Sequence, residues 1–239
     1  MAGGIGSRFW PMSTPEKPKQ FIDVLGCGRT LLQLTVDRFK GICNAENIWV
    51  VTSASYVDLV REQLPEIPEE NILKEPCRRN TAPCIAYVSW RIKSKCPHAN
   101  IVVSPSDHIV MNPTEFQRVI QSCLGFVGES DAIITLGMKP NRPETGYGYI
   151  QADLSASSVR NKEVFRVDSF REKPDLKTAE KYIQKNNYFQ MISKTRSSDV
   201  AKPRQIAILS MHSVFTSLPF QRFSRACFLI MALRRSRKS

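Results

Sequence analysis

Short apolar segments rich in β-branched residues alternate with amphipathic segments over the first 140 residues, and this alternation is the strongest constraint on the fold. The apolar segments, which are typical of buried parallel strands, are 48–52, 101–104 and 132–136. The segments with helical spacing are 30–39 (with Thr30 as N-cap), 56–64, 82–95 and 114–127. Further along, 165–170 is expected to be a more exposed strand and 176–185 a short helix. The alternation predicts an α/β fold, a three-layer sandwich around a mostly parallel, Rossmann-like sheet.

A glycine-rich segment at the start of the chain indicates a phosphate ligand. Gly3, Gly4 and Gly6 can leave backbone N–H groups open to an anion, and Arg8 and Lys19 add two positive charges nearby. The segment lacks the Gly-Lys-Ser/Thr of a Walker A loop, and it lacks the third glycine of a dinucleotide-binding fingerprint. With these two types excluded, the segment is expected to be a polyphosphate-binding loop of another type.

Four further motifs follow this loop in order along the chain. They are Glu75-Pro76 with Arg79-Asn80-Thr81-Ala82-Pro83, Pro105-Ser106-Asp107-His108, Thr145-Gly146-Tyr147-Gly148-Tyr149-Ile150 and Glu172-Lys173-Pro174. Together with the loop, they resemble the bacterial mannose-1-phosphate guanylyltransferases (GDP-mannose pyrophosphorylases) of the sugar nucleotidyltransferase family. The resemblance covers about residues 1–189.

The resemblance implies that mannose 1-phosphate attacks the α-phosphorus of GTP, which yields GDP-mannose and pyrophosphate. It implies a role for each motif residue: Arg8 and Lys19 are catalytic; Ala2, Gly3, Gly4, Gly6, Ser7, Asn80, Thr81 and Ser106 bind the nucleotide; Gly146, Tyr147, Gly148, Glu172 and Lys173 bind the sugar phosphate; Asp107 binds Mg²⁺. The guanine preference comes from the resemblance, because the spacing alone does not select a base. The family's second metal carboxylate has no counterpart that we identify in this sequence.

Several of these residues also have purely structural interpretations. Asp107 can cap a helix, Thr81 can do the same for the helix that follows it, and Gly146 and Gly148 can mark the entry to a strand. His108 is expected to be a structural partner and not a base, because the attacking phosphate oxygen is already anionic. The three tryptophans (Trp10, Trp49 and Trp90) are expected in the core.

Composition restricts the class of protein further. The chain has 239 residues and seven cysteines without metal-binding spacing, which predicts reduced thiols in a cytoplasmic protein. It contains neither a run of 18 apolar residues nor an apolar signal-peptide core, so no membrane association is expected. The net charge of +12 belongs to the C-terminal part: ten basic residues and one acidic residue follow residue 189, which leaves 24 basic and 21 acidic residues, a charge of +3, in residues 1–189.

The chain is therefore expected to consist of a nucleotidyltransferase domain (1–189) and a basic tail (190–239) that is not homologous to the family. The tail shows no clear helix or strand period apart from an apolar run, 228–233. Gln190-Met191-Ile192-Ser193 stands where the family has Trp-Asn-Ser/Ala-Gly, which suggests a shifted reading frame after Phe189. Only Met1 precedes the loop, where the family has an apolar strand. We therefore expect a sheet without its central strand, and poor solubility of the 239-residue chain.

Three alternatives remain open at this stage. The chain could be another sugar-1-phosphate nucleotidyltransferase that uses UTP or dTTP, or an inactive truncated remnant. Binding of nucleic acid by the basic tail is disfavoured, because aromatic residues are not interleaved with the charges.

Overall fold

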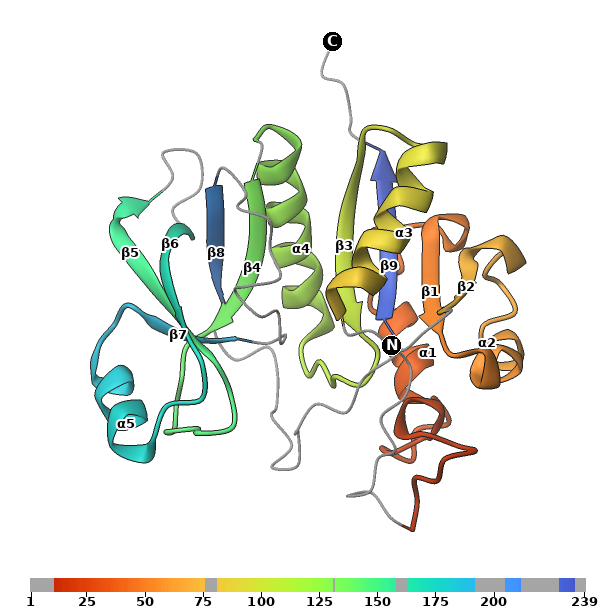
Figure 1. Cartoon of the computed structure of the whole chain (residues 1–239), viewed down its shortest axis with the longest axis horizontal. Coiled ribbons are helices and arrows are strands. Elements are labelled where there is room, and N and C mark those ends of the chain that lie inside the picture. Colours follow the sequence, from red (N-terminus) through yellow and green to blue (C-terminus); the bar gives the residue numbers. More distant parts are fainter. Residues whose placement is uncertain are drawn as a thin grey trace. The chain divides into compact units, whose positions relative to one another are not determined.

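The computed structural model describes residues 11–75, 81–130, 132–157, 163–191, 205–211 and 228–234. The chain forms two compact units (Figure 1). The first contains Met1–Pro113 and Phe215–Ser239, and the second contains Thr114–Val214. The expected boundary between residues 189 and 190 thus falls within the second unit, and the C-terminal tail contributes strands to both units.

The sheet of the first unit has the strand order β2-β1-β9-β3 (Figure 1). Its strands are β1 (Ile48–Thr52), β2 (Ile72–Lys74), β3 (Ala99–Pro105) and β9 (Phe228–Arg234). β1 and β2 are parallel neighbours, whereas β9 is antiparallel to both β1 and β3. The predicted α/β architecture is confirmed. However, the sheet is mixed: β1, β2 and β3 share one direction, and the strand between β1 and β3 runs the other way.

The expected gap at the centre of the sheet is filled by the tail. β9, drawn in dark blue in Figure 1, lies between β1 and β3, with Met231 opposite Ile48 on one side and Val102 on the other. The centre of the sheet is therefore occupied by a strand from the tail, which runs antiparallel to both neighbours. The apolar run in an otherwise basic tail provides the strand, which pairs along the whole length of β3.

The helices of the first unit agree with the sequence pattern. They are α1 (Leu31–Asp37), α2 (Val57–Gln63) and α3 (Thr81–Lys95), with single 3₁₀ turns η1 (Lys19–Phe21), η2 (Ala45–Asn47), η3 (Ala54–Tyr56) and η4 (Glu69–Asn71). Thr30 caps α1 as predicted. Its hydroxyl accepts from the Gln33 amide, and the Gln33 side chain accepts from the Thr30 amide, so both ends of a capping box are present.

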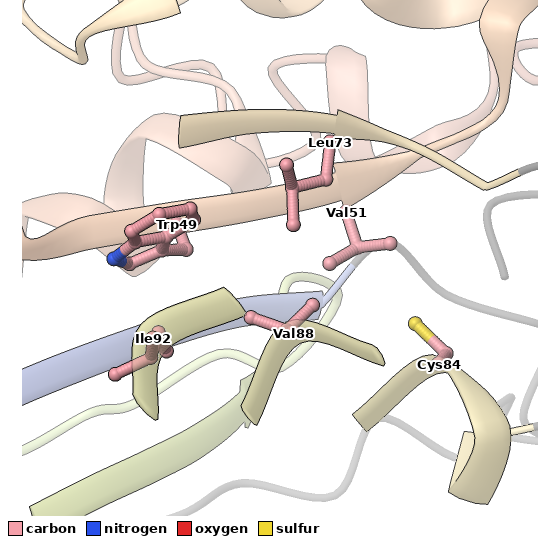
Figure 2. Packing of buried hydrophobic residues seen from close by; sticks show 6 residues of the cluster. All are labelled: Trp49, Val51, Leu73, Cys84, Val88 and Ile92. Atoms are coloured by element: carbon pink, nitrogen blue, oxygen red, sulfur yellow. The ribbon is translucent and has the colours of Figure 1, made fainter. Parts of the chain in front are cut away.

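Helix α3 packs on one face of the sheet and builds a core there. Figure 2 shows strand residues Trp49, Val51 and Leu73 facing three residues one helical turn apart on α3, Cys84, Val88 and Ile92. All five residues of β1 are buried, so both faces of this strand are covered.

The prediction for the tryptophans is half right among the described residues. Trp49 is in the core, whereas Trp90 is 74% exposed, because it lies two positions after Val88 and so off the packed face of α3. The prediction for Trp10 lies outside the described residues.

The described residues of the second unit form a closed barrel of five strands with two helices. The strands follow the order β4-β7-β5-β6-β8 around the barrel. The elements are α4 (Pro113–Gly128), β4 (Ala132–Met138), β5 (Tyr149–Ser157), β6 (Val164–Arg171), α5 (Leu176–Gln184), β7 (Tyr188–Met191) and β8 (Gln205–Met211). The apolar segment 132–136 is thus a strand, as predicted. β4 runs parallel to β8, as expected for this segment, and antiparallel to β7. It belongs to the barrel, however, and not to the sheet of the first unit.

Buried aromatic residues hold the barrel and α5 together. Tyr149 is fully buried, and its hydroxyl accepts hydrogen bonds from the Glu144 amide at 3.0 Å and from Gln190 Nε2 at 3.3 Å. The rings of Tyr182 and Tyr188 stack with centroids 4.0 Å apart.

Across the described parts of both units, no helix is long and apolar enough to span a bilayer.

Candidate functional site

Asp107 lies just beyond the carboxyl end of β3. β3 ends at Pro105, and the chain turns at Ser106 and Asp107. Phe228 of β9 is paired with Val51 of β1 on one side and with Pro105 of β3 on the other. The carboxyl ends of β1 and β3 therefore lie at the same edge of the sheet. In α/β sheets, ligands bind at this edge.

The structure brings Asp107 together with Lys19, another predicted site residue from a distant part of the sequence. Lys19 Nζ lies 2.8 Å from Asp107 Oδ2, and the side chains are only 5% and 2% exposed. Two unlike charges at this distance attract each other by about 6 kcal/mol at an effective dielectric constant of roughly 20, before the cost of desolvation. The predicted phosphate-binding cation and the predicted metal ligand therefore form one buried ion pair.

The turn that carries Lys19 is fixed by its neighbours in the first unit. Lys19 is the first residue of η1, and the fully buried ring of Phe21 in the same turn lies 5.7 Å from the ring of Tyr56. The Tyr56 hydroxyl donates to the carbonyl of Pro15 at 2.8 Å, and Gln63 Nε2 donates to the carbonyl of Phe21 at 3.1 Å. These contacts hold the backbone on both sides of Lys19, so its ammonium group is positioned before any ligand binds.

A buried arginine that the sequence analysis missed contacts the turn of Asp107. Arg38 ends α1, is 5% exposed, and donates to the carbonyls of Pro105 (3.3 Å) and His108 (3.4 Å) and to the Thr35 hydroxyl (2.6 Å). Burial lowers the pKa of Arg38 to about 10, and the charge of Asp107 opposes that shift. Its sequence signal is a single arginine at a helix end, which is also the usual place for a solvated cation.

His108 is neutral near pH 7 in this site. Burial lowers its pKa to about 4, against the charge of Asp107 and together with the charges of Arg38 and Lys19. Its Nε2 lies 3.9 Å from Asp107 Oδ1, beyond hydrogen-bonding distance. The location in the interior agrees with the structural role that the sequence analysis assigned to His108.

The carboxylate of Asp107 fits a magnesium ion carried by a nucleotide. Its Oδ1 is buried and accepts no hydrogen bond in the described structure, which leaves an oxygen with full acceptor capacity for a hard cation. Among the described residues, no cluster of three or more His, Cys, Asp or Glu side chains could form a protein-only metal site. Mg²⁺ is commonly held by one or two carboxylates together with substrate phosphates, and this arrangement matches that pattern.

The predicted sugar-phosphate residues meet at one end of the β5–β6 pair in the second unit. Tyr149 is opposite Arg171, so the segment before β5, with Tyr147 and Gly148, and the segment after β6, with Glu172, leave the pair at the same end. A Cβ on Gly148 would lie 3.2 Å from Met191 Cε and 3.4 Å from the Arg171 carbonyl oxygen, whereas one on Gly146 would meet nothing within 4 Å. The space around Gly148 is thus tight, and the end of the Met191 side chain would have to shift for a larger residue.

Lys173 has an unusual backbone in this segment. Its φ of 35° lies in the left-handed region, which side chains other than glycine adopt at a cost, and Pro174 restricts it further. Glu172 and Lys173 are both exposed. Strained residues of this kind cluster at ligand sites, so the geometry is consistent with the predicted role without assigning a ligand.

The remaining predicted site residues fall into two groups. Ser106 is fully buried beside Asp107, and Thr81 is the first residue of α3. The predictions for Ala2, Gly3, Gly4, Gly6, Ser7, Arg8 and Asn80 lie outside the described residues.

Comparison with known proteins identifies the class of protein. The nucleotidyl transferase family model matches residues 1–204, and the chain therefore belongs to this family. It is similar to two curated mannose-1-phosphate guanylyltransferases, one from Escherichia coli (38% identical over 193 residues) and one from Escherichia coli strain K12 (35% identical over 193 residues). Each match covers 79% of this chain, and the chain spans about 40% of the length of these relatives. The resemblance found from the motifs is confirmed.

A solved structure shows a similar fold. The mannose-1-phosphate geranyltransferase of Thermus thermophilus matches with a TM-score of 0.71 at 23% identity, covering 88% of this chain and 72% of that protein.

Proposed function

We propose that this chain carries the nucleotide-binding part of a mannose-1-phosphate guanylyltransferase, which makes GDP-mannose and pyrophosphate from GTP and mannose 1-phosphate. The observation that carries the proposal is the buried contact between Lys19 and Asp107 at the carboxyl edge of the sheet. The family match supports the reaction class, and the names of the curated relatives support the guanine nucleotide and the sugar phosphate.

Charge positioning is the main task of the residues in this reaction. Lys19 supplies a compact positive charge to the α-phosphate, and its position is fixed by η1 before the substrate arrives. Arg8 and the N–H groups of the glycine-rich loop bind the rest of the triphosphate. No general base is required, because the phosphate oxygen that attacks is already charged.

Asp107 is the residue that would hold Mg²⁺, through the oxygen that accepts no hydrogen bond. The bound cation supplies charge neutralisation and orientation to the phosphate oxygens. Lys19 contacts the other oxygen of the same carboxylate, so the two oxygens of Asp107 have separate tasks. The lysine orients the carboxylate and remains close to the phosphates.

Three further features belong to the proposal. Glu172, Lys173 and the 146–148 segment bind mannose 1-phosphate, and Asn80 and Thr81 contact the nucleotide. The nucleotidyltransferase domain of the complete protein is a three-layer sandwich, which the burial of β1 on both faces supports. The protein acts in the cytoplasm, and the scattered spacing of its seven cysteines supports this proposal because it is not typical of a disulfide framework.

Release of pyrophosphate tests the proposal. The protein is incubated with Mg²⁺ and each pairing of GTP, ATP, UTP or dTTP with mannose 1-phosphate or glucose 1-phosphate, and binding of each nucleotide is measured in parallel. We expect the highest rate with GTP and mannose 1-phosphate. A preference for UTP or dTTP would support the related nucleotidyltransferases instead, and binding of GTP without turnover would identify an inactive remnant.

A matched pair of lysine variants controls this experiment. Lys19→Met removes the buried cation, whereas Lys40→Met removes a 69% exposed lysine that pairs with Asp37 at a similar distance, 2.7 Å. We expect Lys19→Met to lose GTP binding and Lys40→Met to keep it. Equal GTP affinity in both variants would refute the role of Lys19.

A further inference from the structure

The buried guanidinium of Arg38 donates hydrogen bonds to backbone carbonyls, although the position of Arg38 in the sequence does not suggest a role in the site. A guanidinium this far from solvent carries a substantial desolvation cost, which is why its pKa falls to about 10. The structure shows where that cost is offset. Arg38 donates to the carbonyl before Ser106 and Asp107 and to the carbonyl after Asp107, so one side chain spans the segment that contains the carboxylate.

The guanidinium is itself held in place by α1. Thr35, fully buried one helical turn before Arg38, donates its hydroxyl hydrogen to the Leu31 carbonyl at 2.8 Å. Its oxygen then accepts from Arg38 Nη2 at 2.6 Å. A chain of hydrogen bonds therefore runs from the helix backbone through Thr35 and Arg38 to the turn.

We infer that Arg38 is a positioning residue for Asp107, fixing the carboxylate by holding the Pro105 and His108 carbonyls with one planar guanidinium. The inference rests on the proposed function for its consequence, which is the binding of Mg²⁺ with GTP. Lysine cannot replace arginine here, because a single ammonium group has no rigid fork to reach two carbonyls and a hydroxyl at fixed angles. Lys19 acts on the carboxylate directly, whereas Arg38 acts on the backbone that carries it.

Two independent measurements on Arg38→Lys test this inference. The first is GTP binding with and without Mg²⁺, taken as the ratio of the two dissociation constants. We expect the ratio to fall about tenfold, as is common when residues behind a metal ligand are changed, while the affinity for GTP without Mg²⁺ stays the same. The second is amide hydrogen exchange, in which Ser106, Asp107 and His108 should exchange roughly tenfold faster and the amides of α3 should not change.

Thr35→Val and Arg29→Lys complete the set of variants. Thr35→Val removes only the hydroxyl that orients Arg38, and it should produce both effects in weaker form. Arg29→Lys breaks a comparable two-pronged contact, from Nε and Nη2 to Asp37 at 2.9 and 2.8 Å, elsewhere in the same unit. It should lower stability without changing the Mg²⁺ ratio or the exchange of the turn.

The outcomes separate this inference from the proposed function. If the unaltered protein gains nothing from Mg²⁺ in GTP binding, the proposed function fails, and hydrogen exchange alone still decides whether Arg38 fixes the turn. If Arg38→Lys lowers stability like Arg29→Lys but leaves the exchange of the turn and the Mg²⁺ ratio unchanged, Arg38 has only a packing role and the inference is overturned.

Discussion

Removal of Lys19 should destabilise the first unit far more than removal of an exposed lysine with a similar ion pair. In Lys19→Met, the carboxylate of Asp107 stays buried without its 2.8 Å partner. Breaking one side of a buried pair typically costs about 3–5 kcal/mol. We expect the lower end, about 3 kcal/mol, because Arg38 still attracts Asp107. Lys40→Met should cost less than about 1 kcal/mol, since the Lys40 side chain is 69% exposed.

Urea unfolding followed by tryptophan fluorescence measures this difference in the relevant unit. All three tryptophans, at positions 10, 49 and 90, belong to the first unit, and Trp49 is buried in its core. The double variant Lys19→Met with Asp107→Leu removes both charges and should recover much of the lost stability, because apolar pairs often replace buried ion pairs without loss. The reasoning is refuted if Lys19→Met loses no more stability than Lys40→Met, or if the double variant is as unstable as the sum of its single variants.

Three further predictions follow from the packing and the protonation states. The pKa of His108 is about 4 in the folded protein and near 6.5 when unfolded, so the unfolded state takes up its proton first and stability is lost as the pH falls from 6.5 to 4. Protonation of His108 in the unfolded state should therefore lower the free energy of unfolding by about 2–3 kcal/mol between pH 7 and 4.5. Urea unfolding of His108→Gln should show a correspondingly flatter dependence of stability on pH, and an unchanged slope would contradict the buried neutral state of His108. Gly148→Ala should lower stability by about 1 kcal/mol or more, because its Cβ meets Met191 and the Arg171 carbonyl, whereas Gly146→Ala should stay within about 0.5 kcal/mol; equal thermal shifts for the two would be inconsistent with the described packing. Met231→Pro removes an N–H from the strand between β1 and β3 and should abolish cooperative unfolding of the first unit, while Met231→Val should keep it; a normal melt of Met231→Pro in circular dichroism would show that β9 is dispensable.

Local patterns in the sequence were sufficient for the helices and for strands β1, β3 and β6. The capping box at Thr30 and Gln33 and the apolar spacing of Cys84, Val88 and Ile92 are short-range signals, and both are present in the structure. Trp90 shows the limit of a composition argument. It was expected in the core as a tryptophan, whereas its position relative to Val88 places it on the exposed side of α3.

Pairing between distant segments could not be predicted, because it depends on tertiary contacts. Ala132–Met138 has a parallel neighbour, β8, as its composition suggests, but this pair lies in the barrel and not in the sheet of the first unit. The tail has no period that marks β8, and nothing local shows that Phe228–Arg234 inserts antiparallel between β1 and β3.

Individual site residues were predicted from the sequence, but the contacts between them were not. Motifs identified Lys19 and Asp107 separately, and only the fold shows that they touch. Arg38 has no motif, because a buried guanidinium that binds carbonyls has the same sequence signal as a surface cation at a helix end.

Titration of GTP into the protein with and without Mg²⁺, repeated with Asp107→Asn, tests the central claim most directly. The asparagine keeps the shape of the side chain and removes its charge. The account predicts that Mg²⁺ tightens GTP binding to the unaltered protein and that Asp107→Asn abolishes this gain. The same Mg²⁺-dependent gain in both proteins would contradict the assignment of the site.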